Sequence, residues 1–275
     1  MPYSPMKKVI VYVLLVIFAI WTLFPFYWMA STSLKLEDEY WSIPPTWIPM
    51  NPNWRNYELF TTTLGIVSSF LNSLIIGSCS TIITIVVGSL AGYYLARMQF
   101  RGKNNLAFWI LSQRMLPIIS IAVPIYILYR NLGLLDTYIG MIGVYTLMNL
   151  PFAVWVLRSF FVEIPADMEE AAMIDGTSRF GALFRIVFPI SVPGIIATTI
   201  LCFIFSWNEF LFALVLTSLD ARTLPLEIAA MRSTESWRFG QICAICVIAI
   251  IPILLFSLFV QKYIVRGLTL GGVKG

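Results

Sequence analysis

The chain has 275 residues, of which 59% are hydrophobic and only 12% are charged. In an average soluble domain about a quarter of the residues are charged. This composition therefore excludes an ordinary soluble protein and predicts an integral membrane protein. The formal net charge is +4, and nothing in the sequence indicates nucleic-acid binding. Histidine is absent, and the cysteines lie in apolar stretches, which argues against a metal site or a disulfide framework; they are Cys79, Cys202, Cys243 and Cys246.

Six stretches are long and apolar enough to cross a membrane, because a helix crosses the hydrocarbon with about 20 apolar residues. They are residues 9–30, 70–96, 106–129, 138–160, 190–216 and 241–264. The first follows Lys7 and Lys8, as a signal peptide would, but it is longer than a usual signal core and no clear cleavage site follows it. The sequence therefore predicts an all-α protein with six transmembrane helices.

The basic residues predict how these helices are oriented. With six spans both termini lie on one side, and lysine and arginine are enriched in cytoplasmic segments. Eleven basic residues fall on the side of the termini and six on the other side. We therefore expect cytoplasmic termini and a cytoplasmic segment between the fourth and fifth spans, with the segments 31–69 and 217–240 outside.

The second span contains Gly88-x-x-x-Gly92, and small residues four apart allow neighbouring helices to approach closely. Several spans also contain proline, which either kinks a helix or frees carbonyl groups along a hydrated path, and the sequence leaves both open. These prolines are Pro117, Pro124, Pro151, Pro193 and Pro252.

Arg114 lies within the third span, about 12 Å from its cytoplasmic edge at 1.5 Å per residue. A charge there costs at least about 2.5 kcal/mol unless it is paired or hydrated. Glu209, in the fifth span, lies at a depth that differs by about 10 Å if both helices are straight. This argues against a direct salt bridge, so each residue needs its own partner or water.

The polar segment between the fourth and fifth spans predicts two short helices. Pro165 suits a first helical position, acidic residues such as Glu169 and Glu170 favour a helix N-terminus, and Gly176 can end the helix in a left-handed conformation. We place both glutamates on a solvated helix. Ser178 or its neighbour Thr177 can then cap a second helix, which Pro189 ends and which has an apolar stripe at helical spacing: Phe180, Leu183, Phe184 and Val187.

Several polar and aromatic side chains are expected at positions inside the membrane, in the third, fourth and fifth spans. The candidates for a substrate path are Gln113, Arg114, Asn149, Trp207, Asn208 and Glu209. Sugars present hydroxyl groups to polar side chains and apolar ring faces to aromatic ones, so this set suits a hydrated sugar path. Polar side chains also hold transmembrane helices together, and both interpretations remain open.

The sequence predicts no catalytic residue, no metal ligand and no cofactor bound by this chain. The only Gly-Lys pair, Gly102-Lys103, lacks the upstream glycine and the following serine or threonine of a phosphate-binding loop. If ATP is used, ATP and magnesium must be bound by another polypeptide.

The polar segment resembles the EAA loop of ATP-binding-cassette import permeases. The resemblance is carried by Glu170-Ala171-Ala172, by Gly176 four residues later, and by Ile186-x-x-Pro189, with Phe188 where leucine is usual. The sequences 33–35, 43–49, 206–210 and 265–275 are similar to those of the smaller permease in carbohydrate importers of the maltose type, so the resemblance covers nearly the whole chain.

This resemblance implies a type I importer permease bundle with a cytoplasmic coupling helix, in a bacterial inner membrane. It implies a homologous second permease, two copies of a cytoplasmic ATPase and an extracytoplasmic sugar-binding protein as partners, with the binding protein meeting the segments 31–69 and 217–240. It also implies an ATPase-docking element composed of Glu170, Ala171, Ala172, Asp175, Gly176, Phe180, Phe184 and Arg185.

We expect three regions: 1–69, with the first span and first external loop, 70–264, the permease core, and 265–275, a cytoplasmic tail that reaches the ATPases. Two other functions remain open from the residues alone. One is an ion-gradient-driven carrier that uses Arg114 and Glu209 as a charged relay. The other is a membrane scaffold whose helix pair recruits a cytoplasmic partner. The identity of the transported carbohydrate, polyol or glycerol phosphate does not follow from the sequence.

Overall fold

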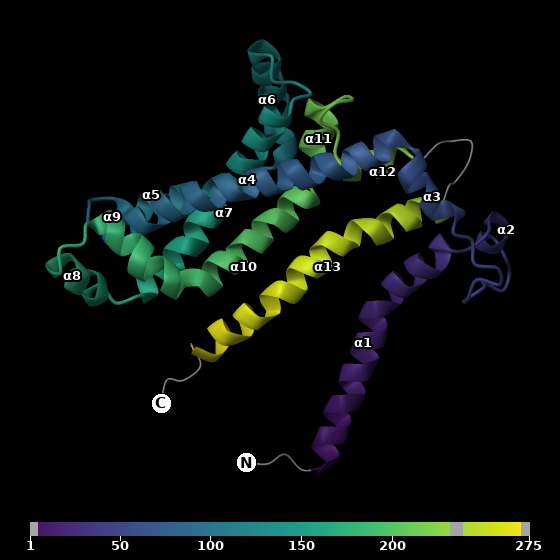
Figure 1. Cartoon of the computed structure of the whole chain (residues 1–275), viewed down its shortest axis with the longest axis horizontal. Coiled ribbons are helices and arrows are strands. Elements are labelled where there is room, and N and C mark those ends of the chain that lie inside the picture. Colours follow the sequence, from purple (N-terminus) through teal and green to yellow (C-terminus); the bar gives the residue numbers. More distant parts are fainter. Residues whose placement is uncertain (1–4, 232–238, 271–275) are drawn as a thin grey trace. The chain divides into compact units, whose positions relative to one another are not determined.

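The computed structural model describes residues 5–231 and 239–270, and over these residues the chain forms helices and turns without β-strands (Figure 1). Five helices are long and apolar enough to cross a membrane: Met6–Ser33, Gly65–Arg97, Tyr138–Glu163, Arg179–Trp207 and Phe239–Phe259. A pair of helices, Lys103–Met115 and Ile118–Leu132, passes the same test but is bent by 91°. The all-α membrane fold is confirmed, and six crossings result if the bent pair is one span.

The chain divides into two compact units. The first contains Met1–Val67 and Ile228–Ile251, and the second contains Ser68–Glu227 and Pro252–Gly275. The helices of the first unit are α1 (Pro5–Ser33), α2 (Glu37–Tyr40), α3 (Arg55–Thr62) and the first part of α13 (Phe239–Leu270).

In the first unit, α3 is fixed to the chain at the end of α1 by hydrogen bonds to backbone carbonyls. The Asn56 amide donates to the carbonyl oxygens of Ser33 and Lys35, at 2.9 and 3.3 Å. The start of α13 packs closely there, because a Cβ atom at Gly240 would lie 1.9 Å from the Tyr40 hydroxyl. Glycine is therefore required at this position.

The second unit contains most of the helices. They are α4 (Leu64–Arg97), α5 (Lys103–Ser112), η1 (Gln113–Met115), α6 (Ile118–Leu132), α7 (Tyr138–Glu163), α8 (Asp167–Ile174), α9 (Arg179–Ala182), η2 (Leu183–Val187), α10 (Phe188–Trp207), α11 (Leu211–Leu216) and α12 (Leu224–Ala230). α7 packs against both α4 and α10. A Cβ atom at Gly88 would lie 3.0 Å from the Ala153 side chain, and one at Gly92 would lie 3.0 Å from the Arg158 backbone nitrogen. The expected close approach at this glycine pair is confirmed.

The third and fifth spans are not the straight helices that we predicted over 106–129 and 190–216. The third breaks after a single 3₁₀ turn, η1, because Pro117 has no amide hydrogen and favours an extended conformation at Leu116 (φ −68°, ψ 127°). The fifth ends at Trp207, and α11 begins only at Leu211. The depth comparison between Arg114 and Glu209 assumed straight helices, and this assumption is wrong.

The segment between the fourth and fifth spans differs from the prediction at its end. Gly176 has φ +88° after α8, so the expected left-handed termination is confirmed. Ser178 caps α9 by accepting a hydrogen bond from the Gly181 amide at 3.1 Å. Pro189 does not end a helix, however: α9 continues through the π-helical turn η2 into α10, and Pro189 stands at the start of α10, directly after a turn in which the regular i→i−4 hydrogen bonding is already interrupted.

The last helix, α13, begins near the predicted sixth span, 241–264, and continues to Leu270. The part 265–270 of the expected tail is therefore helical, and 271–275 lies outside the described residues. Residues 232–238 of the expected external segment 217–240 also lie outside the described residues.

Candidate functional site

α8 is attached to α4 by one buried carboxylate. Glu169 is only 4% exposed, and its side chain accepts hydrogen bonds from the Arg97 guanidinium and the Tyr93 hydroxyl, each at 2.6 Å. Arg97 also donates to the Ile164 carbonyl at 3.0 Å, just before α8. Our prediction that Glu169 lies on a solvated surface is wrong, because the end of α4 covers that side of the helix.

The opposite side of α8 is open. Glu170, Ala171, Asp175 and Gly176 are exposed and Ala172 is half-buried, so this part of the predicted docking element lies together on one surface. Beside it, the Ile174 side chain is 86% exposed. A helix with one side fixed and small, apolar residues on the other presents a surface that a protein groove can cover.

The remaining predicted docking residues follow on α9 and η2. The rings of Phe180 and Phe184 are 62% and 47% exposed and meet edge to face, with their centroids 4.8 Å apart. Phe184 contacts Phe188 in the same way at 4.8 Å. Arg185 is exposed next to this aromatic row. The structure therefore adds an exposed aromatic pair to the chain segment that follows α8.

A cavity of about 570 Å³ lies where the third and fifth spans break. Four of the six predicted path residues line it: Gln113, Arg114, Asn208 and Glu209. The rest of its lining is mainly apolar and comes from η1, α6, α7 and the 205–212 segment. The two helix breaks therefore produce the cavity and bring together polar residues that straight helices would hold at different depths.

Arg114 lies against aromatic rings at this cavity. Its guanidinium carbon is 4.3 Å from the ring centroid of Phe205 and 4.9 Å from that of Phe152. Among the described residues no carboxylate forms an ion pair with Arg114. Cation–π contacts use the flat faces of the guanidinium. Its N–H groups, which lie in the guanidinium plane, stay available to a ligand.

The carboxylate of Glu209 is used by the protein itself. It accepts hydrogen bonds from the backbone amides of Phe212 and Ala213, at 3.0 and 3.3 Å, at the start of α11. Asn208 is exposed, and its side-chain amide donates to the Ile204 carbonyl at 2.8 Å. Glu209 therefore shapes the cavity as a helix cap, whereas Arg114 and Asn208 present polar atoms to it.

The other two predicted path residues lie in the helix packing. Asn149 is fully buried, and its amide donates to the Ser206 hydroxyl at 2.9 Å. Trp207 is 4% exposed and packs against Phe203 and Phe70, with ring centroids 5.6 and 5.7 Å apart. Neither residue lines the cavity.

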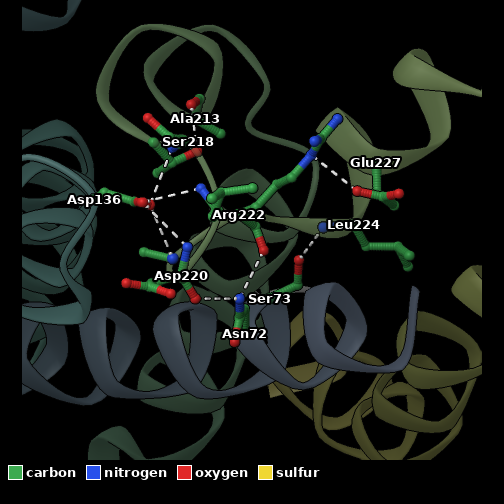
Figure 2. A network of polar contacts seen from close by, with 12 residues as sticks. Asn72, Ser73, Asp136, Ala213, Ser218, Asp220, Arg222, Leu224 and Glu227 are labelled. Carbon is green, nitrogen blue, oxygen red and sulfur yellow. Dashed lines mark hydrogen bonds and ion pairs between the residues drawn. The ribbon is translucent and has the colours of Figure 1, made fainter. Parts of the chain in front are cut away.

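A second polar site joins the α6–α7 connection to the segment after α11 (Figure 2). The Asp136 carboxylate accepts four backbone N–H groups, from residues 218, 219, 220 and 221, at 2.9 to 3.1 Å. Burial alone would raise the pKa of Asp136, but these four hydrogen bonds outweigh it and lower the pKa to about 2. The 218–221 turn is thus wrapped around one charged carboxylate.

The same segment is held by α4, as Figure 2 shows. The Asn72 amide donates to the carbonyls of Asp220 and Arg222, at 2.9 and 2.8 Å. The Ser73 hydroxyl accepts from the Leu224 amide at 2.8 Å. Polar groups from α4 and from the α6–α7 connection therefore fix the whole 218–224 segment in place.

The sequence predictions did not include two polar contacts, that of Glu169 with α4 and that of Asp136 with the 218–221 turn. Glu169 next to Glu170 gives no signal of which acid is buried, although a helical period of 3.6 places them on different sides. Asp136 lies between a glycine turn and the helix cap Thr137, a pattern that indicates a local turn but not a partner more than 80 residues away. Within the described ranges, no cluster of three or more acidic or cysteine side chains is placed to bind a metal ion.

Comparison with known proteins gives consistent matches. Residues 84–270 match the family described as binding-protein-dependent transport system inner membrane component. The chain is 36% identical to the trehalose/maltose transport system permease protein MalG of Thermococcus litoralis, over 98% of each chain. It is 37% identical to the sulfoquinovosyl glycerol transport system permease protein SmoH of Agrobacterium fabrum, over 92% of this chain and 89% of that one.

The fold also matches that of a solved membrane protein. A chain from a bacterial ABC transporter involved in the import of the acidic polysaccharide alginate superposes with a TM-score of 0.79 at 24% identity, covering 96% of this chain and 99% of that one. At this identity the match establishes the fold. With the family match over most of its length, this chain is an inner-membrane permease of the binding-protein-dependent transport family.

Proposed function

We propose that this chain is one of two permease subunits of an ATP-driven carbohydrate importer. The relatives described above are named for trehalose and maltose and for a sulfosugar glycoside, which favours a carbohydrate as the transported molecule. The second permease contributes the other half of the path, and an extracytoplasmic binding protein delivers the sugar. The termini and α8 face the cytoplasm, as the distribution of basic residues predicts.

In this proposal the surface of α8 docks into a groove of a cytoplasmic ATPase. The observation that carries it is the two-sided environment of α8: Glu169 is buried against α4, whereas Ile174 is 86% exposed on the same short helix. Ile174 is followed along the chain by the exposed rings of Phe180 and Phe184, and several exposed apolar side chains in one segment are typical of a protein-binding surface. A movement of the docked ATPase would pass to α4 through Glu169 and to α10 through the continuous α9–η2 helix.

ATP and magnesium are bound by that ATPase, present in two copies. The chain itself contains no phosphate-binding loop. Its contribution is mechanical, so we expect no hydrolytic activity from the purified chain without its partner.

The cavity beside Arg114 provides the sugar-contacting part of this subunit. Its volume, about 570 Å³, lies within the range of about 300–1,000 Å³ typical of small-molecule sites. Arg114 and Asn208 offer hydrogen-bond donors to hydroxyl groups, and the mainly apolar lining suits the ring faces of a sugar. The rigid 218–224 segment is the proposed contact for the binding protein on the opposite side of the membrane.

Copurification and uptake test the coupling role. The test variants are Ala171→Trp and Ala172→Trp, and the matched control is Glu163→Trp, an exposed position at the end of α7. We expect the first two to lose the copurifying ATPase and sugar uptake, and the control to retain both. Uptake by the chain alone under an ion gradient would contradict the proposal in favour of a carrier, and lost ATPase binding without an uptake defect would favour a scaffold.

Substrate identity is tested with the complete transporter in proteoliposomes. Labelled sugars compete for the purified binding protein, and the tightest binders are then assayed for ATP-dependent uptake. If only non-carbohydrate molecules are bound and transported, the carbohydrate assignment is wrong although the importer assignment stands.

A further inference from the structure

A proline-rich segment of the first unit, residues 43–50, folds back along the C-terminal end of α1. The Trp47 carbonyl accepts hydrogen bonds from the Tyr27 and Ser31 hydroxyls, at 2.9 and 2.7 Å. The Trp47 ring lies 5.7 Å from that of Trp28 and 6.1 Å from that of Phe24, between centroids. The segment therefore does not extend away from the helix but lies beside its last three turns.

This position corresponds to the boundary of the membrane. The span Met6–Ser33 has 28 residues and so is about 42 Å long, some 12 Å longer than a hydrocarbon core of about 30 Å. If the excess is shared between both ends, the hydrocarbon ends about four residues before Ser33. Trp28 then lies at the boundary and Phe24 lies below it. Trp47, which contacts both, is at the depth where tryptophan is enriched in membrane proteins.

The side chains of the segment are apolar and exposed. Ile43, Ile48 and Met50 are 97%, 74% and 75% exposed, and Trp47 is 58% exposed. None of residues 43–50 is charged. The patch continues the surface of α1, whose most apolar 18-residue window has none of its residues buried in the described structure. An uncharged patch that adjoins an apolar membrane-spanning helix at this depth matches lipid in chemistry.

The backbone of the segment is also suited to a membrane boundary. An irregular chain there is unfavourable because its amide groups lack water as a hydrogen-bond partner. Three of the eight residues are prolines, which have no amide hydrogen: Pro44, Pro45 and Pro49. The amides of Thr46 and Met50 donate to side-chain oxygens of Ser42 and Glu39, at 3.3 and 3.1 Å. Of the five amide donors in the segment, these two are paired within the protein, and those of Ile43, Trp47 and Ile48 are left to bond water or lipid headgroup oxygens at the boundary.

We propose that residues 43–50 form an interfacial lipid-binding segment, with Trp47 as its anchor, in the leaflet where α1 ends. The acidic α2 residues Glu37 and Asp38, both exposed, mark the water-facing side of the same loop. For these eight residues, lipid replaces the binding protein as the expected contact of the segment 31–69. The assignment concerns the first unit alone and holds whatever molecule the protein transports.

Site-directed spin labelling of the complete transporter in lipid vesicles tests this proposal. Single cysteines are introduced at Ile43, Ile48 and Met50 in a background in which the four native cysteines are replaced by serine or alanine. Asp38→Cys is the matched control, because it is exposed in the same loop on the acidic helix. The measurement is collision with oxygen, which concentrates in lipid, and with a water-soluble nickel complex.

We expect the oxygen-to-nickel ratio at Ile43→Cys, Ile48→Cys and Met50→Cys to be several-fold higher than at Asp38→Cys, with and without added binding protein. Equal ratios at all four positions would place the segment in water and overturn the proposal. Labels shielded from both reagents, either in the transporter alone or only after binding protein is added, would identify a protein contact and also overturn it. Because the readout is independent of uptake, a failed transport assay would not affect the result.

Discussion

The Arg97 guanidinium lies 2.6 Å from the Glu169 carboxylate and joins the last turn of α4 to the first turn of α8. Both side chains are largely buried, at 12% and 5% exposure, so neither is well hydrated if the other is lost. A buried pair of this kind is strongly destabilised when one partner is removed, because the remaining charge has no compensation.

We expect Glu169→Gln to lower stability by about 3 kcal/mol and to reduce sugar uptake per ATP hydrolysed, since α8 would no longer move with α4. Thermal unfolding in detergent measures the first effect and parallel uptake and ATPase assays measure the second. Glu170→Gln is the matched control, because this neighbouring glutamate is exposed. Equal melting temperatures for the two variants would show that the Arg97–Glu169 ion pair contributes nothing to stability. In the double variant Arg97→Gln/Glu169→Gln the two losses should be less than additive.

Gly176 allows a prediction about backbone conformation alone. Its φ is +88°, and an added Cβ atom would meet nothing within 4 Å, so only the backbone opposes a larger residue. Gly176→Ala should cost about 1 kcal/mol and weaken copurification of the ATPase, whereas Gly176→Asn should cost less because asparagine tolerates positive φ. Melting temperature and recovered ATPase are measured for both. If alanine and asparagine behave alike, the left-handed turn is not required.

Asp136 predicts a dependence on pH. Its pKa in the folded protein is about 2, below the value of an unfolded aspartate, so its stabilising effect is complete above about pH 4 and is lost as the pH falls towards 2. Asp136→Asn keeps the side-chain size and tolerates the positive φ of 54°, but it removes the charge that four amides bind. We expect this variant to be destabilised by about 1.5–3 kcal/mol at pH 7.

Limited proteolysis at pH 7 locates that effect. Cleavage within 218–224 should be faster in Asp136→Asn than in the unmodified protein, whereas cleavage at α8, which Asp136 does not contact, should be unchanged. Cleavage of 218–224 at the same rate in both proteins would mean that Asn72 and Ser73 are sufficient to hold the segment.

The lining of the cavity predicts how the size of the transported sugar affects uptake. Leu147 lines it and is 65% exposed, so Leu147→Trp should narrow it and reduce uptake of larger oligosaccharides more than that of monosaccharides. Ile139, on the same helix and 75% exposed, does not line the cavity, and Ile139→Trp is the control. Initial uptake rates for a series of oligosaccharide lengths give the comparison. A proportional loss for all lengths would argue against passage through this cavity.

The sequence predicted the helical class and most helix positions because long apolar runs and their breaks are local signals. The left-handed end of α8 at Gly176 and the close contact at Gly88 and Gly92 were also correct, since both depend on the absence of a side chain. The docking residues were predicted by resemblance, and their exposure is consistent with that role.

The errors came from interactions that no local pattern encodes. Pro117 broke the third span, whereas Pro189 did not end a helix, because it follows a π turn in which the regular i→i−4 hydrogen bonding is already interrupted. For Glu209 the sequence left substrate contact and helix packing open; the residue lines the cavity and binds backbone amides that became available only when the fifth span broke. The partners of Glu169 and Asp136 lie more than 70 residues away along the chain.

α4 makes polar attachments to two different segments, one in its first half and one at its last residue. Asn72 and Ser73 hold the 218–224 segment, and Arg97 holds α8. The 25 residues from Ser73 to Arg97 form one uninterrupted helix, and their 24 steps of 1.5 Å make it about 36 Å long, which exceeds the thickness of the hydrocarbon. If α4 tilts as one rigid helix, both attachments are displaced together, so a movement of α8 would reach the 218–224 segment without a relay of side chains between them.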